Sequence, residues 1–265
     1  MIAATQDAWR RSAIDVESEG EERRCRVQPA QRFQQKASVV PWEASCWSLV
    51  LSMSLRDLLG LHPSSPELAQ HLILLSTQTP TTPQIKSYPD AVYFNYFSIG
   101  LSLLFSPENG YKVTTGLKLH ELDNDKLVLE SIYIYNVPPR NSSHPRSKGT
   151  SSHTTETAYS TYPDFPLALV LTADTRDEEG TTIPRPPKLN VLADTTGKDF
   201  VQALGEPDRK GGGAGPSSGS IGIWCEWSKD GVMVEFGGDE AKGPQAWERG
   251  KDAVWKIITI FSPTI

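Results

Sequence analysis

Two stretches of the chain alternate between apolar and polar positions in the way that short β-hairpins do. Residues 93–105 ("YFNYFSIGLSLLF") and residues 224–236 ("WCEWSKDGVMVEF") can be aligned without a gap, and this places Gly100 opposite Gly231. Aromatic and β-branched residues favour strands, and a glycine favours the turn between them. The sequence therefore predicts two similar aromatic hairpins, one in each half of the chain.

Apolar residues at helical spacing predict a short helix before each hairpin. In the first half this spacing covers residues 47–59 and again residues 65–75. In the second half it covers residues 196–204, where Asp199 completes a capping box and Gly205 follows the last turn. Each hairpin thus has a helix on its N-terminal side.

Further segments have the composition of strands, and one of them sorts its residues clearly between two faces. Ile132 and Ile134 fall on one face of this segment, and Tyr133 and Tyr135 fall on the other. The order helix, hairpin, strand occurs twice, which predicts an α+β fold of two repeated units, each a short helix packed on an antiparallel sheet of three to four strands. The predicted strands are residues 91–97, 101–105, 112–120, 127–137, 165–174, 223–227, 232–236 and 253–261.

The domain organisation follows from changes in composition. Residues 1–40 are charged and aperiodic, which is typical of a disordered or poorly bounded leader. Residues 41–137 form the first predicted repeat, and residues 138–161 are a Ser/Thr/Pro-rich insertion that we expect to be flexible. Residues 162–265 form the second predicted repeat, with a Gly-rich loop at 210–222.

Charge and cysteine content narrow the class of protein. The formal net charge of −6 provides no broad cationic field, which argues against a general nucleic-acid-binding role. The three cysteines, Cys25, Cys46 and Cys225, are far apart and form no C-x-x-C pair, which favours a reducing compartment. We find neither a signal-peptide pattern nor an apolar run long enough to span a membrane, so we expect a cytoplasmic protein.

The familiar motifs of catalysis and phosphate binding are not present in the sequence. The glycines at 211–222 are not followed by a Lys-Ser/Thr pair or by a helix, so a linker is favoured over a phosphate loop. His120, next to Glu121, is either a base or weak metal ligand or part of a surface turn, and the turn is favoured. Cys225 stands between tryptophans without a cationic neighbour, which favours a packed strand residue. We predict no catalytic residue, no cofactor, no metal site and no enzyme activity.

The aromatic residues of the hairpins are the best candidates for binding. Trp224 and Trp227 are separated by an odd number of positions, so a regular strand points them to opposite faces, and the same holds for Tyr93 and Tyr96. One member of each pair could anchor a protein partner or line a shallow pocket, and the alternative is packing within the sheet or under a second layer. The predicted partner-binding residues are Tyr93, Tyr96, Trp224, Trp227 and Trp247.

The first hairpin and its flanks also resemble a known family. The segment "DAVYFNYFSIGLSLLFSPENGYKVTTGLKLH" at residues 90–120 resembles the corresponding segment of the phagosome assembly factor 1 family. In the second half, the helix end "LGEP" at 204–207 and the arm "VEF" at 234–236 are similar in layout. The matching positions of the first segment are Phe94, Asn95, Tyr96, Phe97, Gly100, Leu104, Phe105, Lys112, Val113, Leu119 and His120.

The resemblance implies a non-enzymatic adaptor that joins a WD-repeat propeller and is recruited through this partner to forming autophagic membranes. The residues themselves support the coarser hypothesis of an adaptor or scaffold that binds a protein partner through an aromatic sheet face. The alternative is a small-molecule or lipid-binding module in which the aromatic-lined sheet face forms a pocket.

Overall fold

The computed structural model describes residues 53–76, 82–137, 158–172, 175–176, 181–213 and 222–264. All of them belong to the compact unit Pro41–Ile265. The predicted leader and most of the predicted insertion lie outside the described residues.

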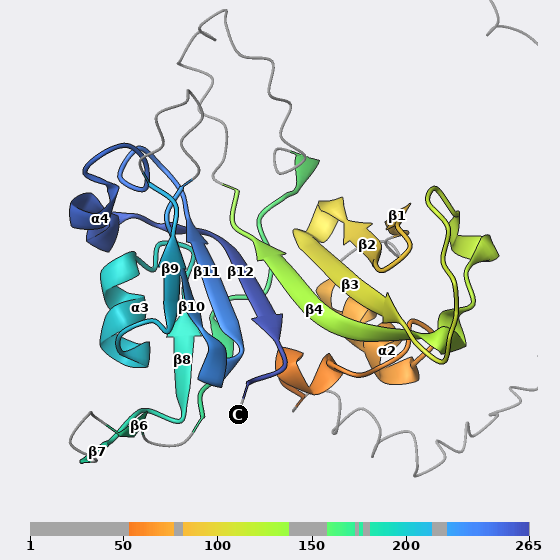
Figure 1. Cartoon of the computed structure of the whole chain (residues 1–265), viewed down its shortest axis with the longest axis horizontal. Coiled ribbons are helices and arrows are strands. Elements are labelled where there is room, and N and C mark those ends of the chain that lie inside the picture. Colours follow the sequence, from red (N-terminus) through yellow and green to blue (C-terminus); the bar gives the residue numbers. More distant parts are fainter. Residues whose placement is uncertain are drawn as a thin grey trace, which may run out of the picture. The chain divides into compact units, whose positions relative to one another are not determined.

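An antiparallel sheet of eight strands forms the centre of the described chain, in the order β1-β2-β3-β4-β12-β11-β10-β9 (Figure 1). The two halves of the sheet have mirrored strand orders. Each half runs from its earliest strand at an edge (β1 or β9) to its last strand at the centre, where β4 pairs with β12. The strands are β1 (Gln84–Ser87), β2 (Val92–Tyr96), β3 (Leu101–Pro107), β4 (Leu127–Tyr135), β9 (Arg209–Gly211), β10 (Trp224–Trp227), β11 (Val232–Phe236) and β12 (Trp255–Phe261).

The other elements are short and confirm the α+β class. Two small antiparallel sheets pair β5 (Leu167–Val170) with β8 (Lys188–Val191), and β6 (Thr175–Arg176) with β7 (Thr182–Ile183). The α-helices are α2 (Pro66–Leu75), α3 (Gly197–Leu204) and α4 (Ala246–Arg249). The 3-10 helices are η1 (Leu55–Leu58), η2 (Phe97–Ile99), η3 (Leu119–Glu121), η4 (Asn124–Lys126), η6 (Ser228–Asp230) and η7 (Gly250–Asp252).

The two aromatic hairpins have the same turn. In each, a 3-10 helix of three residues is followed by a left-handed glycine, Gly100 with φ 58° and Gly231 with φ 57°. A side chain is excluded at both positions, because a Cβ would lie 2.3 Å from the Ser160 carbonyl oxygen in one case and 2.1 Å from that of Phe261 in the other. The turn residue is therefore dictated by backbone conformation and by close approach of a neighbouring chain segment.

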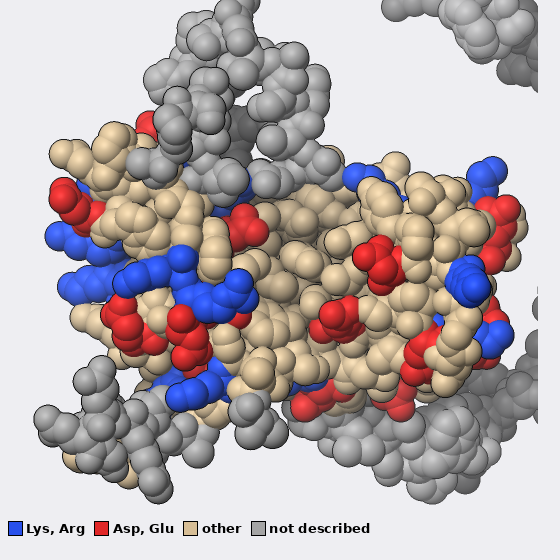
Figure 2. Space-filling view, in the orientation of Figure 1, with Lys and Arg blue, Asp and Glu red and all other residues tan. Residues whose placement is uncertain are grey.

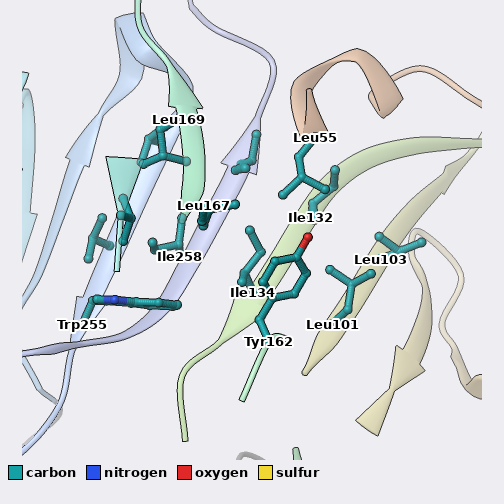
Figure 3. Packing of buried hydrophobic residues seen from close by; sticks show 14 of the residues in the cluster. Leu55, Leu101, Leu103, Ile132, Ile134, Tyr162, Leu167, Leu169, Trp255 and Ile258 are labelled. Atoms are coloured by element: carbon teal, nitrogen blue, oxygen red, sulfur yellow. The ribbon is translucent and has the colours of Figure 1, made fainter. Parts of the chain in front are cut away.

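One face of the large sheet builds the core, and we call it the core face. Leu101, Leu103, Ile132, Ile134 and Ile258 point to it from β3, β4 and β12, and all are at most 1% exposed. Figure 3 shows these side chains together with Leu167 and Leu169 of β5, which lies over β12. Residues of η1, α2 and α3 join the same cluster, among them Leu55, Leu58, Leu68, Leu75, Phe200 and Leu204.

One local prediction was wrong, and a second lies only partly within the described residues. Residues 112–120 form no strand. Gly116 turns the chain with φ 89°, and backbone groups of this segment bond to the Ser87 side chain instead of to a neighbouring strand. The Ser87 hydroxyl donates to the Thr114 carbonyl and accepts from the Leu117 N–H, which replaces a strand ladder. Of the predicted helix at 47–59, the described part contains only the 3-10 helix η1.

Other segments differ in how they pair. The predicted strand at 165–174 is β5, which pairs with β8 in a separate small sheet instead of extending the large one. Residues 158–161, the end of the predicted insertion, are packed onto the sheet, and Tyr159 is 5% exposed. The edge strands β1 and β9 and the helix α4 were not predicted.

Candidate functional site

The second face of the large sheet carries the candidate site, and we call it the open face. Helices α2 and α3 both pack on the core face, and Figure 1 shows the open face toward the viewer with α2 behind β3 and β4. The cross-strand register assigns the side chains to this face. Its residues include Lys86, Tyr93, Asn95, Ser102, Tyr133, Tyr135, Trp224, Glu226, Met233, Glu235 and Thr259.

A cleft of about 460 Å³ opens on this face over the strands β1 to β4. A volume of this size lies within the range of natural ligand pockets. Tyrosines dominate its wall, together with a few small and charged residues, so aromatic faces and hydroxyl groups line the same hollow. The lining residues are Lys86, Tyr88, Asp90, Ala91, Tyr93, Asn95, Ser102, Tyr133, Tyr135 and Tyr159, and we call this site the tyrosine cleft.

The tyrosine rings of the cleft contact one another in two groups. The ring of Tyr93 has its centroid 6.2 Å from that of Tyr88, edge to face, and 6.3 Å from that of Tyr133 at a tilt of 43°. The rings of Tyr135 and Tyr159 stack with centroids 3.7 Å apart and an interplanar angle of 4°. Aromatic packing of this kind holds ring orientation, so the wall of the cleft is preorganised.

Asn95 fixes the floor of the cleft through three hydrogen bonds. Its side-chain Oδ1 accepts from Ser102 Oγ at 2.8 Å and from Tyr159 Oη at 2.6 Å, and its Nδ2 donates to the Gln84 carbonyl at 3.0 Å. The residue is buried, so these bonds satisfy an amide that would otherwise be costly to bury. Asn95 thereby ties β1, β3 and the segment at Tyr159 together.

The electrostatics of the cleft disfavour ionised tyrosine. Burial raises the pKa of Tyr133 to about 12, with further contributions from Tyr93, Glu130 and Glu235. Burial also raises the pKa of Tyr93, assisted by Tyr88, Asp90 and Glu130. Tyr93 and Tyr133 therefore present neutral hydroxyls at physiological pH.

The predicted partner-binding residues divide between the two faces as their odd spacing indicates. Tyr93 and Trp224 lie on the open face and are half-buried. Tyr96 and Trp227 are 5% and 2% exposed on the core face, where Trp227 Nε1 donates to the Gly205 carbonyl at 2.9 Å. These two side chains are occupied by the core. Trp247 lies on α4 with 45% exposure.

Sequence reasoning missed most of the cleft. The alternation in β4 places Tyr133 and Tyr135 on the face opposite Ile132 and Ile134, which was a usable signal. Tyr88 follows β1, and Tyr159 comes from the segment predicted to be a flexible insertion, so neither had a local pattern that marked it.

The Asp230 carboxylate forms a second polar cluster, which connects elements of the core. Its Oδ2 pairs with Arg185 at 2.6 Å, and its Oδ1 accepts from the N–H and the hydroxyl of Thr172, both at 2.9 Å. Arg56 donates to the Asp230 carbonyl. The Arg185 and Asp230 side chains are 5% and 2% exposed, so this cluster is shielded from a ligand and joins the hairpin turn to its neighbours.

The residues considered for chemistry take ordinary structural positions. Cys225 is buried on the core face, and burial raises the pKa of its thiol to about 11, so the thiol is protonated. His120 is exposed in η3. Within the described residues, no group of three His, Cys, Asp or Glu side chains could hold a metal ion. Among the described helices, none has the length and apolar character needed to cross a membrane.

Comparison of the chain with known protein families, curated proteins and solved structures gave no match. The resemblance of residues 90–120 to the phagosome assembly factor 1 family therefore stays a prediction.

Proposed function

We propose that this protein is a non-enzymatic adaptor that docks a protein partner on the open face of its sheet, with the tyrosine cleft as the main anchor site. The observation that supports this is the cleft itself, a preorganised aromatic hollow of about 460 Å³ on the face opposite α2 and α3. Tyrosine is enriched among the residues that dominate protein interfaces, because it combines large apolar area with a polar hydroxyl.

We further infer that the two halves of the sheet derive from one repeated unit. The mirrored strand order supports this, as do the matching left-handed glycines and the register shifts at Leu104/Phe105 and Glu235/Phe236. On this view the cleft is a specialisation of the first half. The counterpart of the Tyr93–Lys86 pair is Trp224 paired with Gly211, and the Trp224 ring fills the space above that glycine.

The family resemblance of residues 90–120 suggests the identity of the partner. We propose a WD-repeat propeller protein, and recruitment to autophagic membranes through that partner. The sequence resemblance supports this part of the proposal, and the cleft supports the choice of the open face as the docking surface.

Affinity capture from cell lysate with matched variants tests the docking proposal. We expect a WD-repeat protein to be captured by the natural chain, and to be lost with Tyr93→Ala and with Tyr88→Ala. Tyr88 is 44% exposed, so Tyr88→Ala should leave the fold intact. This variant keeps the test valid if Tyr93→Ala unfolds the protein. Val201→Ala on α3, 41% exposed, is the control and should capture normally. Capture that is unaffected by both tyrosine variants would refute the proposal.

A small-molecule or lipid ligand is the second candidate, because the volume of the cleft also suits a small ligand. Native mass spectrometry of the purified protein separates the two. A bound metabolite or lipid that disappears in Tyr93→Ala, without a captured protein, would favour this alternative.

A further inference from the structure

We propose that the tyrosine cleft receives a cationic side chain, arginine or lysine, from the docked partner. This inference rests on the proposed docking function and specifies its chemistry. The argument uses the aromatic rings of the cleft, the carboxylates around it and the position of both on the open face.

The rings of the cleft offer faces to a cation. Tyr88, Tyr93 and Tyr133 form a continuous series, with neighbouring centroids 6.2 Å and 6.3 Å apart. An ammonium or guanidinium group within about 6 Å of a tyrosine centroid is attracted by the negative face of the ring, more strongly as water is excluded. Since the centroids of neighbouring rings are this close, one cation over the cleft can contact more than one ring.

Carboxylates lie in the cleft and beside it. Asp90 lines it, and Glu130 and Glu235 are close enough to contribute to the raised pKa of Tyr133. Within the lining Lys86 and Asp90 balance each other, and two further carboxylates, Glu130 and Glu235, lie beside Tyr133. Figure 2 shows Asp and Glu on the surface over β3 and β4, while Lys and Arg gather over β10 and β11 and at the opposite edge of the view.

Other ligand chemistries fit less well. An anionic group such as a phosphate would meet these carboxylates with a single lysine to compensate. A purely apolar side chain offers no hydrogen-bonding group to the polar atoms that line the cleft. A guanidinium or ammonium satisfies both the ring faces and the acidic rim, and an arginine can also donate to the hydroxyls.

Fluorescence anisotropy with a defined probe tests this inference. The probe is a fluorescein-labelled peptide of glycine and serine that carries two arginines, and the reference peptide has glutamine in place of both. We expect the arginine peptide to bind more tightly than the glutamine peptide. Tyr93→Leu should lower the affinity for the arginine peptide by about 3- to 30-fold, whereas Tyr93→Phe, which keeps the ring, should retain this affinity.

The acidic rim is tested with a second set of variants. Glu130→Gln should weaken binding of the arginine peptide while its amide still accepts the Ser106 hydroxyl. Glu248→Gln on α4 removes the same charge from an exposed position outside the cleft and should leave binding unchanged. This control separates a local site from attraction to the net negative charge of the chain.

The outcomes distinguish this inference from the docking proposal. Equal binding of the two peptides, or arginine binding that Tyr93→Leu and Glu130→Gln do not alter, overturns the cationic site. If partner capture still depends on Tyr93 and Tyr88 in that case, docking stands with a different anchor chemistry. If capture is independent of both tyrosines, the docking proposal fails as well.

Discussion

The two tryptophans of the second hairpin have different roles although they are three positions apart. Trp227 is 2% exposed, contacts the ring of Phe200 with centroids 6.4 Å apart, and donates its Nε1 hydrogen to the Gly205 carbonyl. Trp224 lies on the open face against Gly211, whose missing side chain makes room for the ring. The first is a core residue, and the second is a surface aromatic.

This difference predicts unequal effects of the same substitution. Trp227→Ala should lower the free energy of unfolding by about 3–5 kcal/mol, because it leaves a cavity and removes a buried hydrogen bond. Trp224→Ala should cost about 1 kcal/mol, since its ring is half-exposed. Urea denaturation followed by circular dichroism measures both. Equal losses would show that Trp224 also belongs to the core.

At the scale of elements, the buried carboxylate of Asp230 joins segments that are distant in the sequence. Asp230 ends η6, Thr172 follows β5, and Arg185 precedes β8. Arg56 in η1 adds a bond to the Asp230 carbonyl. Since η1 and β5 pack on the core face, this cluster fixes the position of these two elements relative to the turn of the second hairpin.

Removing the charge of Asp230 should therefore be costly. Asp230→Asn keeps the shape of the side chain but leaves the Arg185 guanidinium, 5% exposed, without this carboxylate. We expect the free energy of unfolding to fall by about 3–5 kcal/mol. Asp239→Asn, at an exposed position, is the matched control and should change it by less than about 0.5 kcal/mol. Thermal and urea unfolding of both variants provide the measurement, and a neutral Asp230→Asn would contradict the role given to the cluster.

The elements that the sequence predicted well are those specified by local pattern. The two aromatic hairpins and the helices at α2 and α3 depend on alternation, turn glycines and caps, which are all local. The edge strand β1 begins with Gln84 and contains Lys86, so its pattern is weak and its pairing with β2 decides its structure. Residues 112–120 had a loose alternation, but the Ser87 hydroxyl and Gly116 outweigh it.

The candidate site was predictable only in part, because local pattern marks the strand residues of the cleft but not the residues that reach it from elsewhere in the chain. Tyr93 and Trp224 could be placed on one face by strand periodicity, and so could Tyr133 and Tyr135. The cleft also requires Tyr159 to stack on Tyr135 and bond to Asn95, which depends on where the chain returns after the insertion. Long-range returns of this kind leave no periodic signal in the sequence.

At the scale of the whole molecule, the β4–β12 seam makes the two halves of the sheet one structure. Ile132 and Ile134 of β4 pair with Ile260 and Ile258 of β12, and all four are at most 3% exposed. Leu167 and Leu169 of strand β5 are buried beside this seam, over β12 (Figure 3). Because each half depends on the other to bury these side chains, we expect them to unfold together.

Ile134→Ala tests this coupling. The substitution removes apolar volume from the seam and should lower the free energy of unfolding by about 2–5 kcal/mol. Hydrogen exchange followed by mass spectrometry should then show faster exchange in β3 and β4 and equally in β11 and β12, because a global opening exposes both halves. Acceleration confined to the first half would mean that each half is a separate folding unit, and the shared seam would then be a contact between independent domains.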